Sequence, residues 1–213
     1  TGRFEFSGPV GEKATYRGDT INAAASDAAA ARHRHIRWRF RDGAVLDYID
    51  PRRFGYVYLG PMVGLRERLN MGPDPFEIRP RELERMLAGR RAPVKALLLN
   101  QRLIAGLGNI YVDEALFLAG VHPLTPGDVA ATSAPVILRT ARRVLRSAIR
   151  FNGTTLRDYR RLNGDSGEFQ NRLKVYGRGG EACPRCGAPI EKMVVGGRGT
   201  HACRRCQPRP PAR

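Results

Sequence analysis

Residues 183–206 read CPRCGAPIEKMVVGGRGTHACRRC. Two Cys-x2-Cys pairs, Cys183 with Cys186 and Cys203 with Cys206, stand 16 residues apart. Each such turn can place two thiolates about 2.3 Å from one Zn²⁺, and this spacing is typical of four-thiolate zinc sites. Since cysteine occupies all four positions, no ligand position is left for water, and one structural zinc ion is predicted. A pair of redox dithiols is the alternative.

The segment between the two cysteine pairs, residues 194–200, is expected to form a β-hairpin with Arg198 exposed at its tip. Glycines there allow a backbone to approach a ligand closely. A guanidinium suits a phosphate or a nucleic-acid groove. A solvated hairpin charge is the alternative.

The composition places limits on the partner. The chain has 213 residues, 42% of them hydrophobic, and a formal net charge of +17. It is long enough for one large or two smaller domains, and such a surplus of positive charge favours nucleic acid as the partner. A generally basic protein is the alternative. No apolar run reaches the roughly 18 residues that span a bilayer, so no membrane partner and a cytoplasmic location are expected.

The N-terminal part has a β pattern. Alternation at residues 35–40 and 45–49 predicts a hairpin, and residues 55–59 are expected to form a third strand. Residues 11–32 lack periodicity and are expected to form a loop. Three strands make a poor independent domain, so a segment preceding Thr1 is expected.

The central part has a helical pattern. It begins at Pro80, and further helices are expected at residues 93–99, 110–118, 125–128, 134–151 and 154–159. The long helix has an apolar stripe formed by Val136, Ile137, Ala141, Val144, Leu145, Ala148 and Ile149. Its other side carries Arg139, Arg142, Arg143, Arg146 and Arg150. This arginine face is either a solvated surface or a track for phosphates.

Four segments together resemble the formamidopyrimidine-DNA glycosylase and endonuclease VIII family. They are residues 50–55, 106–114, 153–159 and 175–178, the last followed by the cysteine ribbon. They occur in the family's order, and the resemblance covers residues 1–207. It implies an α+β multidomain fold with an N-terminal β-sandwich, a helix-two-turn-helix domain and a C-terminal zinc finger.

The resemblance also implies domain boundaries. Residues 1–75 would be a remnant of the sandwich, residues 76–165 the helix-two-turn-helix domain, and residues 166–213 the lesion-loop and zinc-finger region. Residues 163–169, which span the second boundary, are similar to the loop that closes over an oxidised purine. This loop and the Arg-Arg-Phe sequence at residues 52–54 favour the formamidopyrimidine branch over the endonuclease VIII branch.

Nine residues resemble DNA contacts of the family. Arg52 and Phe54 are similar to the pair that fills the gap left by an everted base, since an arginine offers donors to the orphaned base and a phenylalanine wedges between base steps. Arg53 would support that loop, and Lys95 is similar to a lysine that faces the DNA beside the lesion. The expected phosphate and further DNA contacts are His33, Arg90, Asn109, Tyr111 and Arg198, and Arg198 is also linked to the second elimination step.

The catalytic N-terminus of the family has no counterpart in this sequence. The family uses an N-terminal proline, whose amine attacks the sugar to give a Schiff base, with a neighbouring glutamate and a lysine. Thr1 is not proline, and Pro-Glu-Leu-Pro-Glu occurs nowhere. Glu5, Glu114 and Glu168 are expected to be surface charges and do not replace the missing glutamate.

Three functions follow as hypotheses. The whole protein would remove oxidised purines such as 8-oxoguanine and formamidopyrimidine and then cleave the abasic site, while the chain as numbered is a catalytically incomplete fragment. The alternative is a non-catalytic, zinc-dependent binder of duplex or abasic DNA. The third is an unrelated zinc-ribbon protein of the ribosome or transcription apparatus. Under the first two, the partner is damaged double-stranded DNA, bound by a monomer associated with the bacterial nucleoid.

Overall fold

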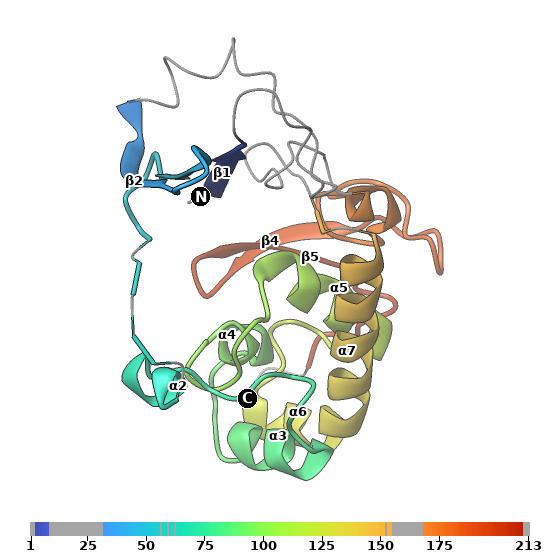
Figure 1. Cartoon of the computed structure of the whole chain (residues 1–213). Helices are drawn as coiled ribbons and strands as arrows, with labels where there is room; N and C mark the ends of the chain where they lie inside the picture. Colours follow the sequence, from blue (N-terminus) through green and yellow to red (C-terminus); the bar gives the residue numbers. More distant parts are fainter. Residues whose placement is uncertain are drawn as a thin grey trace. The chain divides into compact units, whose positions relative to one another are not determined.

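The computed structural model describes residues 3–8, 32–55, 57–58, 60–61, 63–151, 153–154 and 168–210 (Figure 1). The chain divides into two compact units. The first comprises residues 1–60 and 151–171, and the second comprises residues 61–150 and 172–213.

The first unit contains an antiparallel sheet with the strand order β1-β3-β2. Its strands are β1 (Arg3–Ser7), β2 (Arg34–Arg39) and β3 (Val45–Ile49). The tight turn between β2 and β3 is closed by Phe40, whose N–H donates to the carbonyl oxygen of Ala44 at 2.8 Å. The predicted β2–β3 hairpin is therefore confirmed.

The third strand of this sheet is β1, which lies in the N-terminal part that was expected to have β structure. The ring of Phe4 lies 5.3 Å from the ring of Tyr48 and 6.1 Å from that of Trp38. The strand expected at residues 55–59 is wrong for the described residues of that segment, which have no strand pairing. Alternation alone is not sufficient there, because a strand also needs a partner for its ladder of hydrogen bonds. Tyr56 and Leu59 lie outside the described residues.

Three other expectations fall on residues that the structure does not describe. The loop predicted at residues 11–32 lies outside the described residues except for Arg32. The capped helix expected at residues 154–159 is described only at Thr154. The purine-closing loop at residues 163–169 is described only at its last two residues.

The second unit is mainly helical. Its helices are α2 (Leu65–Arg68), α3 (Pro80–Leu87), α4 (Val94–Leu98), α5 (Asn109–Ala119), α6 (Gly127–Ala130), the 3₁₀ turn η1 (Ala131–Ser133) and α7 (Ala134–Arg150). A hairpin of β4 (Glu191–Val195) and β5 (Arg198–Ala202) follows, and the 3₁₀ turn η2 (Phe169–Arg172) precedes it. The long helices predicted from periodicity are confirmed within a few residues. None of the described helices is both long and apolar enough to cross a bilayer.

Helix α7 packs against α5 and α3, as its apolar stripe predicts. One position of that stripe is wrong: the side chain of Ile149 is 69% exposed. The arginine face is also not simply solvated. Nε of Arg142 donates to the carbonyl oxygen of Pro75 at 2.7 Å, and the guanidinium of Arg146 lies 5.4 Å from the ring of Phe76. These two arginines therefore fix the turn before α3.

The helices and the cysteine ribbon form one compact unit. The cause is a shared core. Phe117 of α5 packs with Val175, Ile190, Cys183 and Cys203. A helix side chain and two of the cysteines are thus buried against each other.

Candidate functional site

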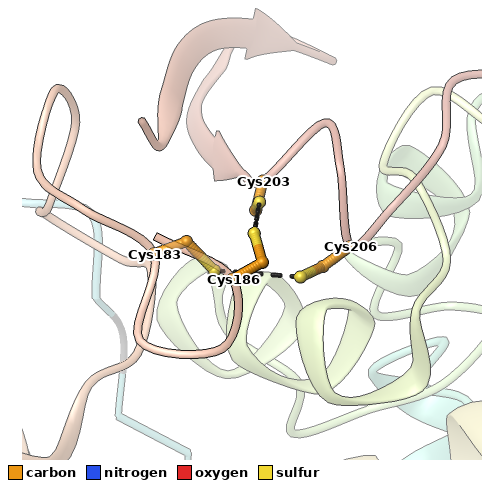
Figure 2. A group of neighbouring side chains, drawn as sticks. All are labelled: Cys183, Cys186, Cys203 and Cys206. Atoms are coloured by element: carbon orange, nitrogen blue, oxygen red, sulfur yellow. Dashed lines mark hydrogen bonds between the residues drawn. The ribbon is translucent and has the colours of Figure 1, made fainter. Parts of the chain in front are cut away.

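The four cysteines converge at one point (Figure 2). All four Sγ atoms lie within 4.8 Å of one another, with 3.8 Å between Cys183 and Cys206 and 3.5 Å between Cys186 and Cys203. Tetrahedral sulfurs at a Zn–S distance of about 2.3 Å would be about 3.8 Å apart. The arrangement fits a four-thiolate zinc ion with no open ligand position, as the spacing predicted.

The cysteine cluster is joined to the segment that follows α5 by Gln207, for which the sequence pattern indicated no role. The amide of Gln207 accepts the N–H of Cys203 at 3.0 Å and donates to the carbonyl oxygen of Val121 at 2.8 Å. The guanidinium of Arg185 lies over the ring of Phe117 at 4.6 Å. The position of the metal site is therefore determined relative to the helix.

Glu114 has a different place from the one expected. It is buried, and its carboxylate accepts the backbone N–H groups of Lys174, Val175 and Tyr176 at 2.9 Å. The expectation of a helix-surface charge is wrong, because α5 turns this residue towards the segment that leads into the ribbon. Glu114 therefore fixes that segment on α5.

Lys95, which was expected to face the DNA, is buried instead. Its side chain is 0% exposed, and its ammonium donates to Asp113 Oδ1 at 2.6 Å, Thr200 Oγ1 at 2.8 Å and the carbonyl oxygen of Gly199 at 3.0 Å. All three of its N–H donors are thus satisfied within the protein. The expected direct contact of Lys95 with DNA is corrected, because this ammonium has no surface to offer a phosphate.

The Lys95–Asp113 pair lies out of water, and this shifts both of its acid–base equilibria. Burial raises the pKa of Asp113 to about 6, and the neighbouring ammonium opposes the shift. Burial lowers the pKa of Lys95, and the carboxylate of Asp113 opposes that shift. Each member of the pair keeps the other ionised, so removing either alone leaves a buried charge without a partner.

Asn109 and Arg198 lie on neighbouring elements of the second unit. Arg198 is exposed at the start of β5, after a turn in which Gly196 and Gly197 have φ of 57° and 72°. Nδ2 of Asn109 donates to the carbonyl oxygen of Gly199 at 2.9 Å. The structure thus joins Asn109 to the residue that follows Arg198.

The N-terminus of α5 adds donors at the same place. The helix begins at Asn109 after an extended Gly108, and no side chain caps it. The first N–H groups of a helix have no partner within the helix and carry partial positive charge. Together with the guanidinium of Arg198, they form a surface suited to an anion.

The loop of residues 50–55 in the first unit, here called the wedge loop, is held by a buried aspartate. Asp50 accepts the N–H of Arg52 at 3.2 Å and that of Gly55 at 2.8 Å. Phe54 is 79% exposed, and the guanidinium of Arg52 lies 5.5 Å from its ring. Arg53 between them has φ of 56°. The loop therefore presents an arginine and a phenylalanine side by side on a supported backbone.

The remaining predicted contacts are placed as follows. His33 is exposed immediately before β2. Arg90 is exposed, and its Nε donates to the carbonyl oxygen of Met86 at the end of α3 at 2.8 Å. Tyr111 is half-buried in the first turn of α5. Their roles in binding stay predictions.

Two family models match the chain, mostly within the second unit. "Formamidopyrimidine-DNA glycosylase H2TH domain" matches residues 71–160, and "Zinc finger found in FPG and IleRS" matches residues 180–209. The second match covers all four cysteines, so the zinc finger and its structural zinc ion, both inferred from the spacing, are confirmed.

Curated relatives are similar over most of the chain. A formamidopyrimidine-DNA glycosylase from Chloroflexus aggregans is 46% identical over 172 residues, which are 79% of this chain and 62% of that protein. One from Bacillus cereus (strain ATCC 10987) is 41% identical over 189 residues, covering 86% and 68%. The chain thus spans slightly over three fifths of the length of the first of these relatives.

Solved structures of similar proteins have the same fold over most of this chain. The MutM (Fpg) protein from Thermus thermophilus has a TM-score of 0.74 and 42% identity, with 84% of this chain and 70% of that chain covered. Lactococcus lactis Fpg, solved in complex with DNA that contains an abasic site, has a TM-score of 0.78 and 32% identity, with 98% and 72% covered.

Proposed function

The chain belongs to the formamidopyrimidine-DNA glycosylase family, and from this membership we propose that its protein repairs oxidised purines in double-stranded DNA. The substrates would be 8-oxoguanine and formamidopyrimidine bases. The glycosidic bond is broken by an amine that attacks the sugar C1′, and the abasic sugar is then cleaved by elimination. The family is one of DNA glycosylases with abasic-site lyase activity.

The observation that carries this proposal is the wedge loop. An enzyme that acts on a base inside a duplex takes the base out of the stack and must stabilise the gap that is left. Phe54 supplies exposed apolar surface for a base step, and Arg52 beside it supplies donors for the orphaned partner base. Asp50 holds the loop by its backbone.

The second unit supports the same proposal with a phosphate-binding surface. Arg198, Asn109 and the N-terminus of α5 offer donors that read no base, and such contacts set the position of a protein on a duplex. The net charge of +17 adds a salt-dependent attraction to DNA. The zinc ion has a structural role in this surface, because its thiolates hold the two ends of the β4–β5 segment.

The polypeptide of residues 1–213 is proposed to bind DNA without removing bases. It contains no Pro-Glu sequence of the kind that supplies the nucleophile and acid in the family. Arg198 would take part in the elimination step once such a nucleophile is provided. Binding as a monomer, association with the nucleoid and a bacterial cytoplasmic location are parts of the same proposal.

Borohydride trapping tests this proposal. The zinc-loaded polypeptide is mixed with a duplex that carries 8-oxoguanine opposite cytosine, and separately with an abasic duplex, and borohydride is added to reduce any Schiff base. We expect binding to the abasic duplex and no covalent adduct on a denaturing gel. An adduct would mean that an amine of residues 1–213 performs the chemistry, and it would overturn the non-catalytic assignment. Absence of any preference for the abasic duplex would count against the wedge loop.

A further inference from the structure

Lys95 lies within a network that ends at the backbone of Arg198. The ammonium of Lys95 donates to Thr200 Oγ1 at 2.8 Å. Since that lone pair of the hydroxyl is used, its own hydrogen points elsewhere, and Thr200 Oγ1 donates to the carbonyl oxygen of Arg198 at 2.9 Å. Lys95 thus reaches the carbonyl of Arg198 through one hydroxyl group.

The ammonium of Lys95 also holds the next carbonyl along the chain, that of Gly199. The oxygen of Gly199 accepts from Lys95 Nζ at 3.0 Å and from Asn109 Nδ2 at 2.9 Å. A carbonyl oxygen has two lone pairs, and both are used here. The peptide unit between Gly199 and Thr200 is therefore joined to both α4 and α5.

Helix α5 completes the arrangement. Asn109 and Asp113 are four residues apart and so lie on the same face of the helix. Asp113 accepts the ammonium of Lys95 through Oδ1 and the N–H of His201 through Oδ2, at 2.6 and 2.9 Å. One face of α5 thus carries Asn109 and, one turn further along, Asp113. Asp113 holds β5, the strand that begins at Arg198.

We infer that Lys95 is a positioning residue for phosphate binding: with Asp113 and Thr200 it fixes the backbone of Arg198 at a set distance from Asn109, so that both side chains can grip one phosphate. The inference rests on the proposed function, since that function supplies the DNA. Lys95 itself does not touch the ligand.

A purely structural role would not need these groups. A buried ion pair costs desolvation, and apolar side chains of similar size often replace such a pair without loss of stability. What apolar side chains cannot do is hold two consecutive carbonyl oxygens. The hairpin tip also has little space to shift, because a Cβ atom built on Gly196 would lie 3.1 Å from the Cβ atom of Ala96 in α4. Both features favour a positioning role of Lys95 and Asp113 for Arg198 over a purely structural role.

The test measures whether the effect of Arg198 depends on Lys95. Lys95→Met alone leaves the carboxylate of Asp113 buried and unpaired, so the central variant is Lys95→Met/Asp113→Asn. Asparagine removes the charge and keeps an oxygen for the N–H of His201. Arg198→Ala is then made in the wild-type protein and in this double variant. Arg204→Ala is the matched control, because Arg204 is a cation of the same zinc finger that is paired with Glu191 and has no assigned contact with DNA.

The readouts are the affinity for an abasic duplex over a range of salt concentrations, the zinc content and the thermal midpoint. In the wild type, Arg198→Ala should weaken binding about tenfold or more and lower the salt slope by about one, as loss of one charged phosphate contact requires. In the folded, zinc-loaded double variant, the same change should have little further effect. Equal losses in both backgrounds would overturn the positioning role.

A second pair of variants keeps the test decisive if the double variant does not fold. Thr200→Val removes the hydroxyl between Lys95 and Arg198 at nearly constant shape, and Thr200→Ser retains it. We expect a weaker effect of Arg198→Ala in the valine variant than in the serine variant, and equal effects would overturn the inference. A wild-type protein without salt-dependent affinity for the abasic duplex would instead refute the proposed function, whatever the variants do.

Discussion

The carboxylate of Asp50 accepts the backbone N–H of Gly55 at 2.8 Å, across the loop that carries Arg52 and Phe54. The same oxygen accepts the hydroxyl of Tyr48 at 3.3 Å. One buried charge therefore connects the end of β3 to both sides of the wedge loop. Asp50 thus supports the backbone that carries the exposed ring of Phe54.

Gly55→Ala tests that support. A Cβ atom built on Gly55 would lie 1.8 Å from the hydroxyl oxygen of Tyr48, so the loop or the tyrosine must move. We expect a loss of about 1–3 kcal/mol in unfolding free energy, as for overpacking elsewhere, and weaker binding to an abasic duplex. Urea denaturation and a binding titration measure the two effects.

Tyr48→Phe provides the control, since it removes the atom that the new methyl group would meet. Gly55→Ala should cost less in this background, because the next atom of the ring would lie 3.1 Å away. An equal cost with and without the hydroxyl would show that the steric explanation is wrong.

Glu114→Gln tests the link between α5 and the segment before the ribbon. Glutamine keeps one acceptor oxygen but loses the charge that strengthens the three backbone hydrogen bonds. We expect about 1.5–3 kcal/mol of destabilisation, the usual value for hydrogen bonds to a charged group. Glu84→Gln on the exposed side of α3 is the matched control and should leave the denaturation midpoint unchanged. Equal stability of the two variants would contradict the role given to Glu114.

The contrast between the cysteines and Lys95 shows where prediction from sequence works. The cysteine pairs carry their own geometry, since each is a local turn and four thiolates need only one ion. Lys95 has partners 104 and 105 positions away, and no local pattern distinguishes a buried lysine from a solvated one. Its burial arises from tertiary packing of the hairpin on α4 and α5.

The same distinction applies to the elements. Periodicity predicted α7 and the β2–β3 hairpin because each buries one face along its own length. It failed at residues 55–59, where the aromatic alternation has no strand to pair with among the described residues. The pairing of β1 with β3 was not predicted, because it joins residues far apart in the chain. The position of Glu114 on the buried side of α5 was missed for the same reason, since its acceptor role involves backbone donors 60 residues later.

Removal of zinc should release the hairpin that carries Arg198. The cysteine cluster is part of the core around Phe117, so its loss should lower the thermal midpoint as well as the affinity for DNA. Metal analysis should give one zinc per chain, and cobalt substitution should give the visible absorption of a tetrahedral thiolate site. Restored binding after zinc is added back is the control. Unchanged binding after verified loss of zinc would contradict the role of the finger.

His122 should make stability depend on pH. Burial lowers the pKa of this histidine below its usual 6.5, and its Nδ1 accepts the N–H of Leu124 at 3.2 Å. The unfolded chain therefore binds a proton more readily than the folded one, and the contribution of His122 is complete above about pH 6.5 and is lost as the pH falls below it.

The comparison variant is His122→Asn, whose side-chain oxygen can accept the same N–H without titrating. Urea denaturation at about pH 7.5 and about pH 5.5, on either side of the ordinary histidine pKa, should show that the advantage of the wild type over this variant shrinks at the lower pH. If the difference in unfolding free energy between the wild type and His122→Asn were the same at both pH values, the pH-dependent role of His122 would be contradicted.

The most direct measurement compares the affinity of the zinc-loaded protein for an abasic duplex with its affinity for the intact duplex of the same sequence. Arg52→Ala and Phe54→Ala should weaken binding to the abasic duplex by about tenfold or more, and binding to the intact duplex much less, because only the abasic site has a gap to fill. Phe40→Ala, at another exposed ring of the first unit, should change neither affinity. Equal losses on both duplexes, or no preference of the wild type for the abasic one, would contradict recognition of damaged DNA by this chain.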